Sequence, residues 1–123
     1  MELQTYLQRL IGKTVTNTVI TTSTVIARKI DKDDPDNIKT ELTFQLYIDD
    51  YTLNIYNPIT ILPSEKDFAD VKGLKIVAVE ESDEKAELIF DNSYNLIVDM
   101  RDEAYDGPEA LYLTGPNHFW VAW

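Results

Sequence analysis

The chain has 123 residues, 44% of them hydrophobic, and no cysteine, which suits a single domain over residues 1–123 and excludes disulfides and thiolate metal sites. Its 22 acidic and 11 basic residues give a formal net charge of -11, which argues against binding to nucleic acid or to an anionic membrane, because both repel such a surface. No apolar run reaches the ~20 residues that span a bilayer, and no secretory signal opens the chain, so we expect a cytoplasmic protein.

The first thirty residues predict a short helix and then strands. The apolar residues at the start follow a helical spacing: Leu3, Leu7, Leu10 and Ile11. Gly12 is a suitable helix stop. Residues 14–30 are rich in Thr, Val and Ile, which favour strands. We expect two strands there, about 14–20 and 23–30, with a turn near Thr21 and Thr22, followed by a charged loop from Asp31 to Asn37.

Residues 41–55 carry the clearest local pattern, because apolar and polar side chains alternate on both sides of Asp49 and Asp50. A two-residue turn there predicts three cross-strand pairs: Ile48 with Tyr51, Leu46 with Leu53, and Phe44 with Ile55. All six side chains then lie on one buried face of a sheet.

Further elements follow at regular intervals. Asn57 and Pro58 end this hairpin, and Ser64 is a candidate N-cap for a helical turn that ends near Gly73, with Asp67 three residues on. A strand is expected over 74–80. A second hairpin over 85–99, with the loop Asp91–Ser93, would pair Phe90 with Tyr94, Leu88 with Leu96 and Ala86 with Val98. A last hairpin is expected from Leu111–Leu113 and Phe119–Trp123.

Residues 10–15 resemble residues 71–76, and a hairpin follows each segment. This similarity favours two related halves, although chance explains so short a match nearly as well. The pattern predicts a mostly β fold with minor helix: an antiparallel β-sandwich or partly open barrel of about eight strands, with a short N-terminal helix.

Nothing in the chain points to catalysis. The single histidine, His118, stands in a terminal turn, and no Gly-x-Ser-x-Gly, P-loop or His-Glu-x-x-His motif occurs. Without cysteine, a Cys–His nucleophile is impossible. We therefore predict a protein that is not an enzyme and that has no cofactor and no metal.

The segment from Val98 to Glu109 holds the densest group of polar residues. Its five acidic residues surround Arg101 and Tyr105. Their spacing differs from that of a calcium-binding EF-hand loop, and nothing marks a sugar cleft beside them. A structural loop, in which Arg101 pairs with Asp99 or Asp102, competes with a partner-binding loop as its interpretation.

Two tryptophans close the chain, Trp120 and Trp123, three positions apart. A straight strand places such residues on opposite faces, so one is expected in the core, and the other, with Tyr112, is expected either at the surface or packed under the N-terminal helix. An exposed aromatic residue beside carboxylates would form a suitable protein-binding patch.

The C-terminal quarter, from Val98 to Glu109 and on through Leu111–Pro116 to Trp120–Trp123, resembles small acidic immunity proteins of contact-dependent growth-inhibition and other polymorphic toxin systems of bacteria. The resemblance implies a short cytoplasmic protein that binds one cognate toxin domain, often a basic nuclease, and blocks it. It carries over no individual binding residue.

The charge pattern supports the same hypothesis independently. Residues 1–30 carry one acid and four bases, a net charge of +3, so the remaining residues carry -14. A nuclease is cationic because it holds phosphates, so an acidic inhibitor gains fast association with it. The candidate contacts are Asp31, Asp33, Asp34, Asp36, Glu80, Glu81, Asp83, Glu84, Asp102, Glu103, Tyr105, Asp106, Tyr112 and Trp120. A small-ligand-binding β-barrel and a homo-oligomeric structural domain are the alternatives.

Overall fold

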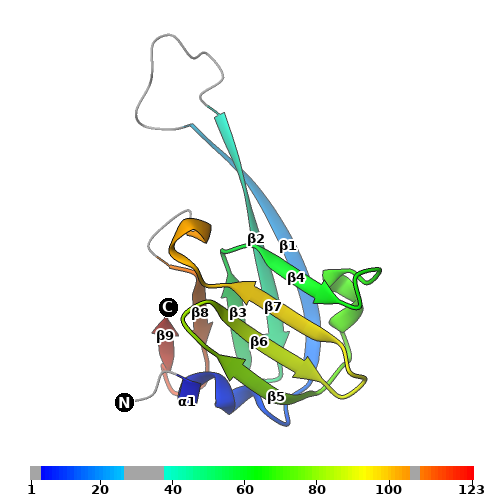
Figure 1. Cartoon of the computed structure of the whole chain (residues 1–123). Helices are drawn as coiled ribbons and strands as arrows, with labels where there is room; N and C mark the ends of the chain where they lie inside the picture. Colours follow the sequence, from blue (N-terminus) through cyan, green and yellow to red (C-terminus); the bar gives the residue numbers. More distant parts are fainter. Residues whose placement is uncertain (1–3, 27–37, 106–108) are drawn as a thin grey trace.

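The computed structural model describes residues 4–26, 38–105 and 109–123, and the mostly β prediction is confirmed. The described strands form two antiparallel sheets that face one another as an open sandwich (Figure 1). Neither sheet closes into a barrel. Among these residues, no helix has the length and the apolar character needed to cross a lipid bilayer.

The five-stranded sheet has the order β1-β2-β3-β8-β9. Its strands are β1 (Val15–Ile26), β2 (Ile38–Ile48), β3 (Tyr51–Ile55), β8 (Leu111–Thr114) and β9 (Trp120–Ala122). The four-stranded sheet has the order β4-β7-β6-β5. Its strands are β4 (Ile59–Leu62), β7 (Asn95–Asp99), β6 (Lys85–Phe90) and β5 (Ile76–Glu81). The helical segments are short: α1 (Gln4–Leu7) and the 3-10 helices η1 (Gln8–Leu10), η2 (Phe68–Val71) and η3 (Asp102–Ala104).

The registers of the predicted hairpins are confirmed. Ile48 lies opposite Tyr51, Leu46 opposite Leu53 and Phe44 opposite Ile55. In the second hairpin, Ala86 lies opposite Val98 and Leu88 opposite Leu96, and the Phe90 N–H donates to the Tyr94 carbonyl at 2.8 Å. The hairpin of β8 and β9 also forms as expected. In each case the alternation of apolar residues places one face of the strand in the core.

Two local predictions are wrong. Residues 14–30 do not turn near Thr21 and Thr22, because β1 runs without a break through both residues, which lie opposite Thr43 and Leu42 of β2. β-Branched residues cannot readily adopt the positive φ angles of a tight hairpin turn. The helical turn after β4 is η2, and its N-cap residue is Asp67 and not Ser64. Asp67 and Asp70 form a capping box, in which the Asp67 N–H donates to the Asp70 carboxylate at 2.7 Å.

Buried aliphatic side chains from both sheets fill the interior. The largest contributions come from the inward positions of β2, β3, β6, β7 and β8, with Leu7 and Leu10 from the N-terminal helical turns: Leu46, Ile48, Leu53, Ile55, Leu88, Phe90, Leu96, Leu111 and Leu113. Ile11, the last residue of the predicted helical stripe, is 44% exposed, because the helix ends before it.

The two similar sequence segments occupy matching positions in the fold. The Gly12 N–H donates to the Ile76 carbonyl and the Gly73 N–H to the Val15 carbonyl, both at 2.7 Å. The φ angles of the two glycines are 88° and 87°. The register of each following strand shifts at its start, between Val15 and Asn17 in β1 and between Ile76 and Ala78 in β5. The two halves are therefore related by an approximate two-fold axis, and their sheets are structural counterparts.

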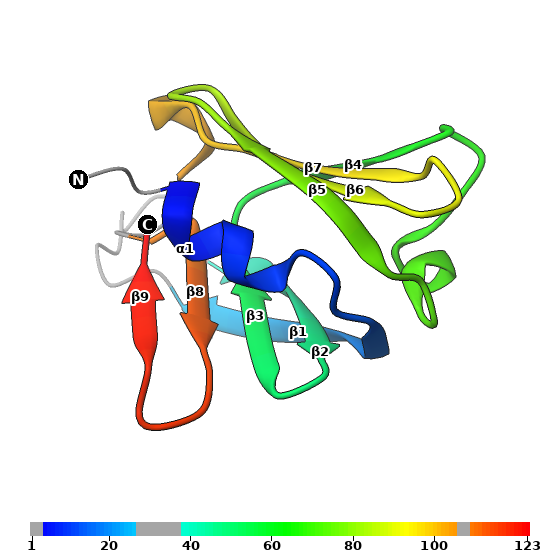
Figure 2. The same cartoon turned by 90° about the horizontal axis from the view of Figure 1, so that it is seen from below.

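The first helical turns position the end of the chain. Figure 2 shows α1 between the sheets, beside β5 on one side and the hairpin of β8 and β9 on the other. The Tyr6 ring lies 6.1 Å from the Phe119 ring and 6.5 Å from the Trp123 ring, between centroids. The Arg9 guanidinium sits 4.1 Å above the Phe119 ring. These contacts fix Trp123 against the opposite sheet.

Candidate protein-binding site

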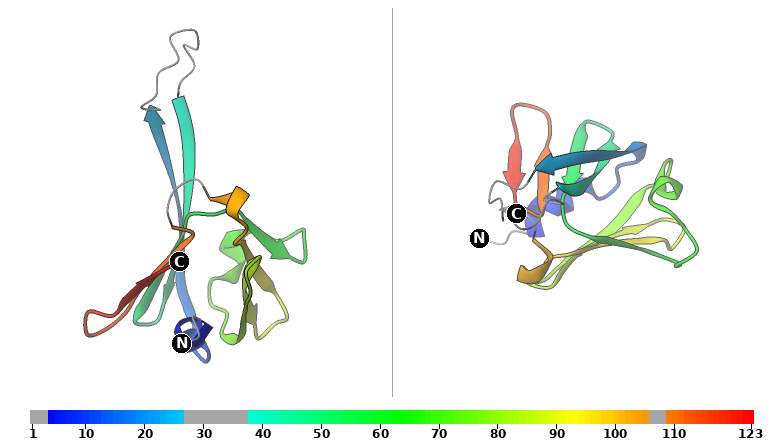
Figure 3. Two further views of the ribbon diagram at one scale, coloured as in Figure 1. Left: turned by 60° about the vertical axis from the view of Figure 1, so that its left-hand side comes forward. Right: turned by 90° about the horizontal axis from the view of Figure 1, so that it is seen from above.

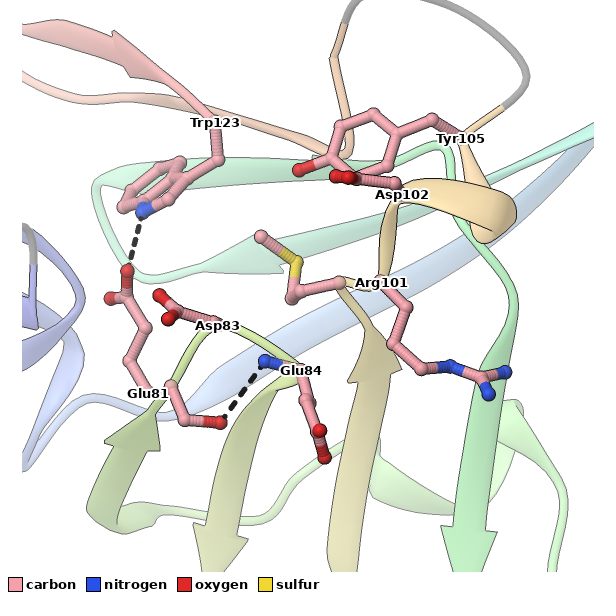
Figure 4. Close-up of a pocket in the computed structure, with 9 residues that line it drawn as sticks. Glu81, Asp83, Glu84, Arg101, Asp102, Tyr105 and Trp123 are labelled. Atoms are coloured by element: carbon pink, nitrogen blue, oxygen red, sulfur yellow. Dashed lines mark hydrogen bonds between the residues drawn. The ribbon is translucent and has the colours of Figure 1, made fainter.

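Two of the acidic segments meet at one end of the sandwich. The turn between β5 and β6 and the segment that follows β7 enclose an open hollow of about 600 Å³, which we call the acidic hollow. Its lining residues are Glu81, Ser82, Asp83, Glu84, Met100, Arg101, Asp102, Tyr105 and Trp123 (Figure 4). Four of these nine side chains are carboxylates, so the hollow concentrates negative charge between aromatic walls.

Glu81 is the most constrained acid of the hollow. It lies opposite Ala86 in the sheet register, so its side chain points inward, toward the other sheet. There its Oε2 accepts a hydrogen bond from the indole N–H of Trp123 at 3.0 Å. Its Oε1 is buried and has no hydrogen-bond partner among the described residues. Burial raises the pKa of Glu81, and the bond from Trp123 offsets only part of that effect.

The basic residue of the lining, Arg101, pairs with Asp99, which is not part of the lining, although Glu84 is close enough to interact with it electrostatically. Its Nη2 lies 2.7 Å from Asp99 Oδ2, and its Nε donates to Asp99 Oδ1 at 2.9 Å. The guanidinium therefore points away from Glu81 and Asp102 (Figure 4). The pairing, with the bond from the Arg101 N–H, lowers the pKa of Asp99 to about 2. The predicted pairing of Arg101 with Asp99 is therefore present, and it lies in the same segment as the candidate site.

Backbone bonds hold the two acidic segments together. The Met100 N–H donates to the Glu84 carbonyl at 2.9 Å, and the Ser82 N–H donates to the Lys85 carbonyl at 2.8 Å. The Ser82 hydroxyl oxygen accepts from the N–H groups of Glu84 and Lys85, both at 3.3 Å. A turn closed in this way holds Asp83 and Glu84 in place before any partner arrives.

The chemistry of the hollow suits a cationic side chain. Met100 is 8% exposed and contributes an apolar surface. Tyr105 and Trp123 supply aromatic faces, which attract cations. A lysine or arginine side chain has an apolar stem and a charged head, so it can use both kinds of surface. The arrangement can therefore accommodate a basic side chain.

The structure separates the other predicted contacts from the hollow. Glu80 lies opposite Glu87, on the face of β5 that points away from the core. Glu103 is exposed, and its Oε1 is 3.8 Å from Arg101 Nε. Tyr112 and Trp120 pair on the hairpin of β8 and β9, with ring centroids 6.1 Å apart. The predictions at Asp31, Asp33, Asp34, Asp36 and Asp106 fall outside the described residues.

The sequence prediction missed four residues of the hollow: Ser82, Met100, Arg101 and Trp123. Of these, Trp123 is the one that bonds to Glu81. The spacing of the two tryptophans correctly separates an exposed residue, Trp120 at 65%, from one packed on the core, Trp123. From the sequence, a tryptophan in the core predicts a structural role only. The signal that points to its second role is the indole N–H, which needs an acceptor when buried.

Neither the histidine nor the acids form a further chemical centre. His118 is exposed in the turn before β9, with a φ angle of 62°. Within the described ranges, no three His, Cys, Asp or Glu side chains converge as a metal site would require. No protein-family model, no curated protein and no solved structure matches this chain.

Proposed function

We propose that this chain is a cytoplasmic immunity protein that binds and neutralises one cognate basic toxin domain, a nuclease in the leading hypothesis. In this proposal the acidic hollow receives a lysine or arginine side chain of the toxin. The remaining acids of the same end attract the toxin over longer distances.

One observation supports this proposal above the others: Glu81 keeps a buried carboxylate oxygen without a hydrogen-bond donor. An unpaired buried oxygen costs free energy in the isolated domain, on the order of 1–3 kcal/mol for a fully buried group and less for one partly open to water. A cationic side chain that enters the hollow lies beside this carboxylate and stabilises its charge, and it becomes a donor to Oε1 when the Glu81 side chain turns toward it. The cost in the free protein then becomes part of the binding free energy.

The distribution of charge supports the same proposal. Asp83, Glu84 and Asp102 lie at the exposed rim of the hollow, where charges raise the association rate more than the final affinity. Glu81 lies deeper, beside Trp123, where a charge pair is shielded from salt. In this proposal the exposed acids at the rim raise the association rate, and Glu81 stabilises the complex once it has formed.

A peptide titration tests the recognition step. Trp120→Phe leaves Trp123 as the sole tryptophan, so its fluorescence reports on the hollow. A short peptide with one central arginine should change that emission, whereas the same peptide with citrulline, which is uncharged and nearly isosteric, should not. Equal responses to both peptides would remove the cationic-receptor proposal.

A growth experiment tests the biological step. The toxin domain encoded directly upstream of this chain is expressed in a bacterium with and without the chain. The chain should restore growth, and Glu81→Ala together with Glu84→Ala should reduce the rescue. If no toxin domain is encoded there, or if the chain gives no rescue, the immunity role is wrong even where the arginine peptide binds.

The alternative of a small ligand inside a barrel has no comparable support. The sheets are open, and a second open hollow of about 580 Å³ lies between them beside Ile20, Phe44 and Phe68. Among the described residues, neither of the buried polar atoms that lack a partner lies in it. The acidic hollow is open, and its lining comes from the turn between β5 and β6, the segment after β7 and the chain end at Trp123.

A further inference from the structure

From Thr43 of β2 across to β9, the outer surface of the five-stranded sheet carries no charge at its described positions, and the charged positions that share this register, Lys39 and Glu41, lie farther along β2. The inward positions of β2, β3 and β8 hold apolar side chains, most of them buried, so the residues between them point outward. On β2 and β3 these are Thr43, Gln45, Tyr47, Thr52 and Asn54. On β8 and β9 they are Tyr112, Thr114, Trp120 and Ala122. The edge strand β1 adds Asn17, Val19 and Thr21. We call these residues the neutral face.

The counterpart sheet shows that this composition is not a property of the fold. The four-stranded sheet occupies the equivalent place in the second half of the chain. Its outward positions include Glu80, Lys85, Glu87 and Asp99, and Lys85 Nζ pairs with Glu87 Oε1 at 3.1 Å. One outer face is therefore charged and ion-paired across its strands, while the neutral face has no charge from Thr43 to Ala122, in a chain with a net charge of -11.

The side chains of the neutral face are already ordered. Gln45 Nε2 donates to Asn54 Oδ1 at 2.8 Å, and the Tyr47 hydroxyl donates to Gln45 Oε1 at 2.9 Å. Tyr112 and Trp120 stack edge to face, and Trp120 is 65% exposed. Tyrosine and tryptophan are enriched in protein interfaces and charged residues are depleted at their centres. Ordered side chains also lose less entropy on binding.

We infer that the neutral face binds a second copy of this chain, sheet against sheet, about a two-fold axis. Two molecules of charge -11 repel each other least when the surfaces that come into contact carry no charge. A basic partner, by contrast, gains nothing from a neutral surface and is drawn to the acidic end. Figures 2 and 3 show the outer side of β3, β8 and β9 with no described element over it.

This arrangement is compatible with the proposed function and independent of it. The acidic hollow opens between the two sheets, whereas the neutral face is the side of the five-stranded sheet that points away from the other sheet. A pair of chains joined by their neutral faces would keep both hollows accessible. A variant can therefore lose self-association and still bind the arginine peptide, or lose peptide binding and still self-associate.

Sedimentation velocity of the full chain over a range of concentrations tests this inference. The expected mass is twice 14.1 kDa at the higher concentrations. Gln45→Glu and Trp120→Glu should each weaken the dimer by about tenfold or more, because a two-fold axis brings like charges together. Thr60→Glu adds the same charge to the exposed outer side of β4 and should leave the dimer intact.

Cross-linking separates face pairing from edge pairing. The chain has no cysteine, so Asn54→Cys places one thiol on β3, the central strand of its sheet. A bismaleimide that reaches about 10 Å, the spacing of packed sheets, should join two such copies. Pairing through the edge strand β1 would hold these thiols about 24 Å apart, since four further strands would intervene. A monomer at every concentration, or a dimer that Asn54→Cys does not cross-link, overturns the inference.

Discussion

The indole N–H of Trp123 and Oε2 of Glu81 lie 3.0 Å apart and join the two sheets at the acidic end. Trp123 follows β9 in one sheet, and Glu81 ends β5 in the other. The bond satisfies the indole and one carboxylate oxygen and leaves the other oxygen without a donor. The buried oxygen without a donor therefore carries a cost to the stability of the free domain.

The free-energy cost of burying the charged Glu81 carboxylate predicts the effect of Glu81→Gln. Burial raises the pKa of Glu81, so the charged form destabilises the fold above the folded-state pKa, and the penalty disappears below the unfolded value of about 4.3. The glutamine keeps an acceptor for Trp123 without the charge. We expect Glu81→Gln to raise the free energy of unfolding at pH 7, by less than about 1 kcal/mol because the site is partly solvated.

Urea denaturation at pH 7 and pH 4 measures this effect. The advantage of the variant should be present at pH 7 and much smaller at pH 4, and arginine-peptide binding should fall at pH 7. Glu80→Gln, on the outward side of the same strand, is the matched control. A variant that is less stable than the natural chain at pH 7 would contradict the role assigned to the buried oxygen.

The pair of Asp99 and Arg101 predicts an opposite dependence on pH. Arg101 lowers the pKa of Asp99 to about 2. The contribution of Asp99 to stability is therefore complete above its unfolded pKa of about 3.9 and is lost as the pH falls toward 2. We expect the thermal midpoint of Asp99→Asn to lie below that of the natural chain at pH 6, with the difference shrinking between pH 4 and pH 2.

The same variant tests the electrostatics of the hollow. Without Asp99, the Arg101 guanidinium is free to turn toward the carboxylates, so binding of the arginine peptide should weaken. Glu103→Gln is the control, since Glu103 is exposed and contacts Arg101 only at 3.8 Å. A constant difference in midpoint from pH 6 to pH 2 would show that the pairing does not control stability.

The hairpins could be predicted from sequence because, in each, the alternation of apolar side chains agreed with the position of turn-forming residues. In residues 41–55 the alternation fixed the face, and Asp49 and Asp50 marked the turn, where Asp49 adopts a φ angle of 50°. Near Thr21 only the composition suggested a break, and no residue there favours a turn. Continuation of β1 was the physically consistent interpretation.

The candidate site was predictable in part. The register of the second hairpin places Lys85 opposite Asp99. The next residues outward on the two strands, Glu84 and Met100, are therefore neighbours. The hairpin alone thus brings the two acidic segments together. The position of Trp123 does not follow, because it depends on how one sheet packs on the other. Sequence alternation specifies which face is buried but not which residues meet across the core.

The two halves predict matched effects for Gly12→Ala and Gly73→Ala. Both glycines have φ angles near 87°, and an added Cβ would meet no atom within 4 Å at either position. The cost is therefore backbone strain alone, about 1 kcal/mol for each. Urea denaturation should give similar losses for both variants. Asparagine tolerates positive φ better, so Gly12→Asn and Gly73→Asn should cost less, and a large difference between the halves would argue against their equivalence.

Gly115 is required for a different reason. A Cβ at this position would lie 2.5 Å from Cε2 of Tyr51, a ring that is 7% exposed and stacks on Phe119. Gly115→Ala should therefore destabilise the fold by about 1–3 kcal/mol through overpacking. A double-mutant cycle with Tyr51→Leu checks the cause, because the alanine should cost little once the ring is absent. An unchanged cost in the Tyr51→Leu background would assign the effect to the backbone.

The rim of the acidic hollow predicts a local effect of charge on association. Glu84 lines the hollow, whereas Glu65 lies after β4 and is exposed outside it. Glu84→Lys and Glu65→Lys change the net charge equally, so a difference between them reports position and not total charge. In stopped-flow experiments with nona-arginine, followed by Trp123 fluorescence in the Trp120→Phe background, Glu84→Lys should slow association about tenfold at low salt and Glu65→Lys much less. The difference should narrow at 0.5 M salt, where charges more than a few ångströms apart are screened. Equal slowing by both variants would mean that the acidic surface attracts cations as a whole and that the hollow is not the binding site.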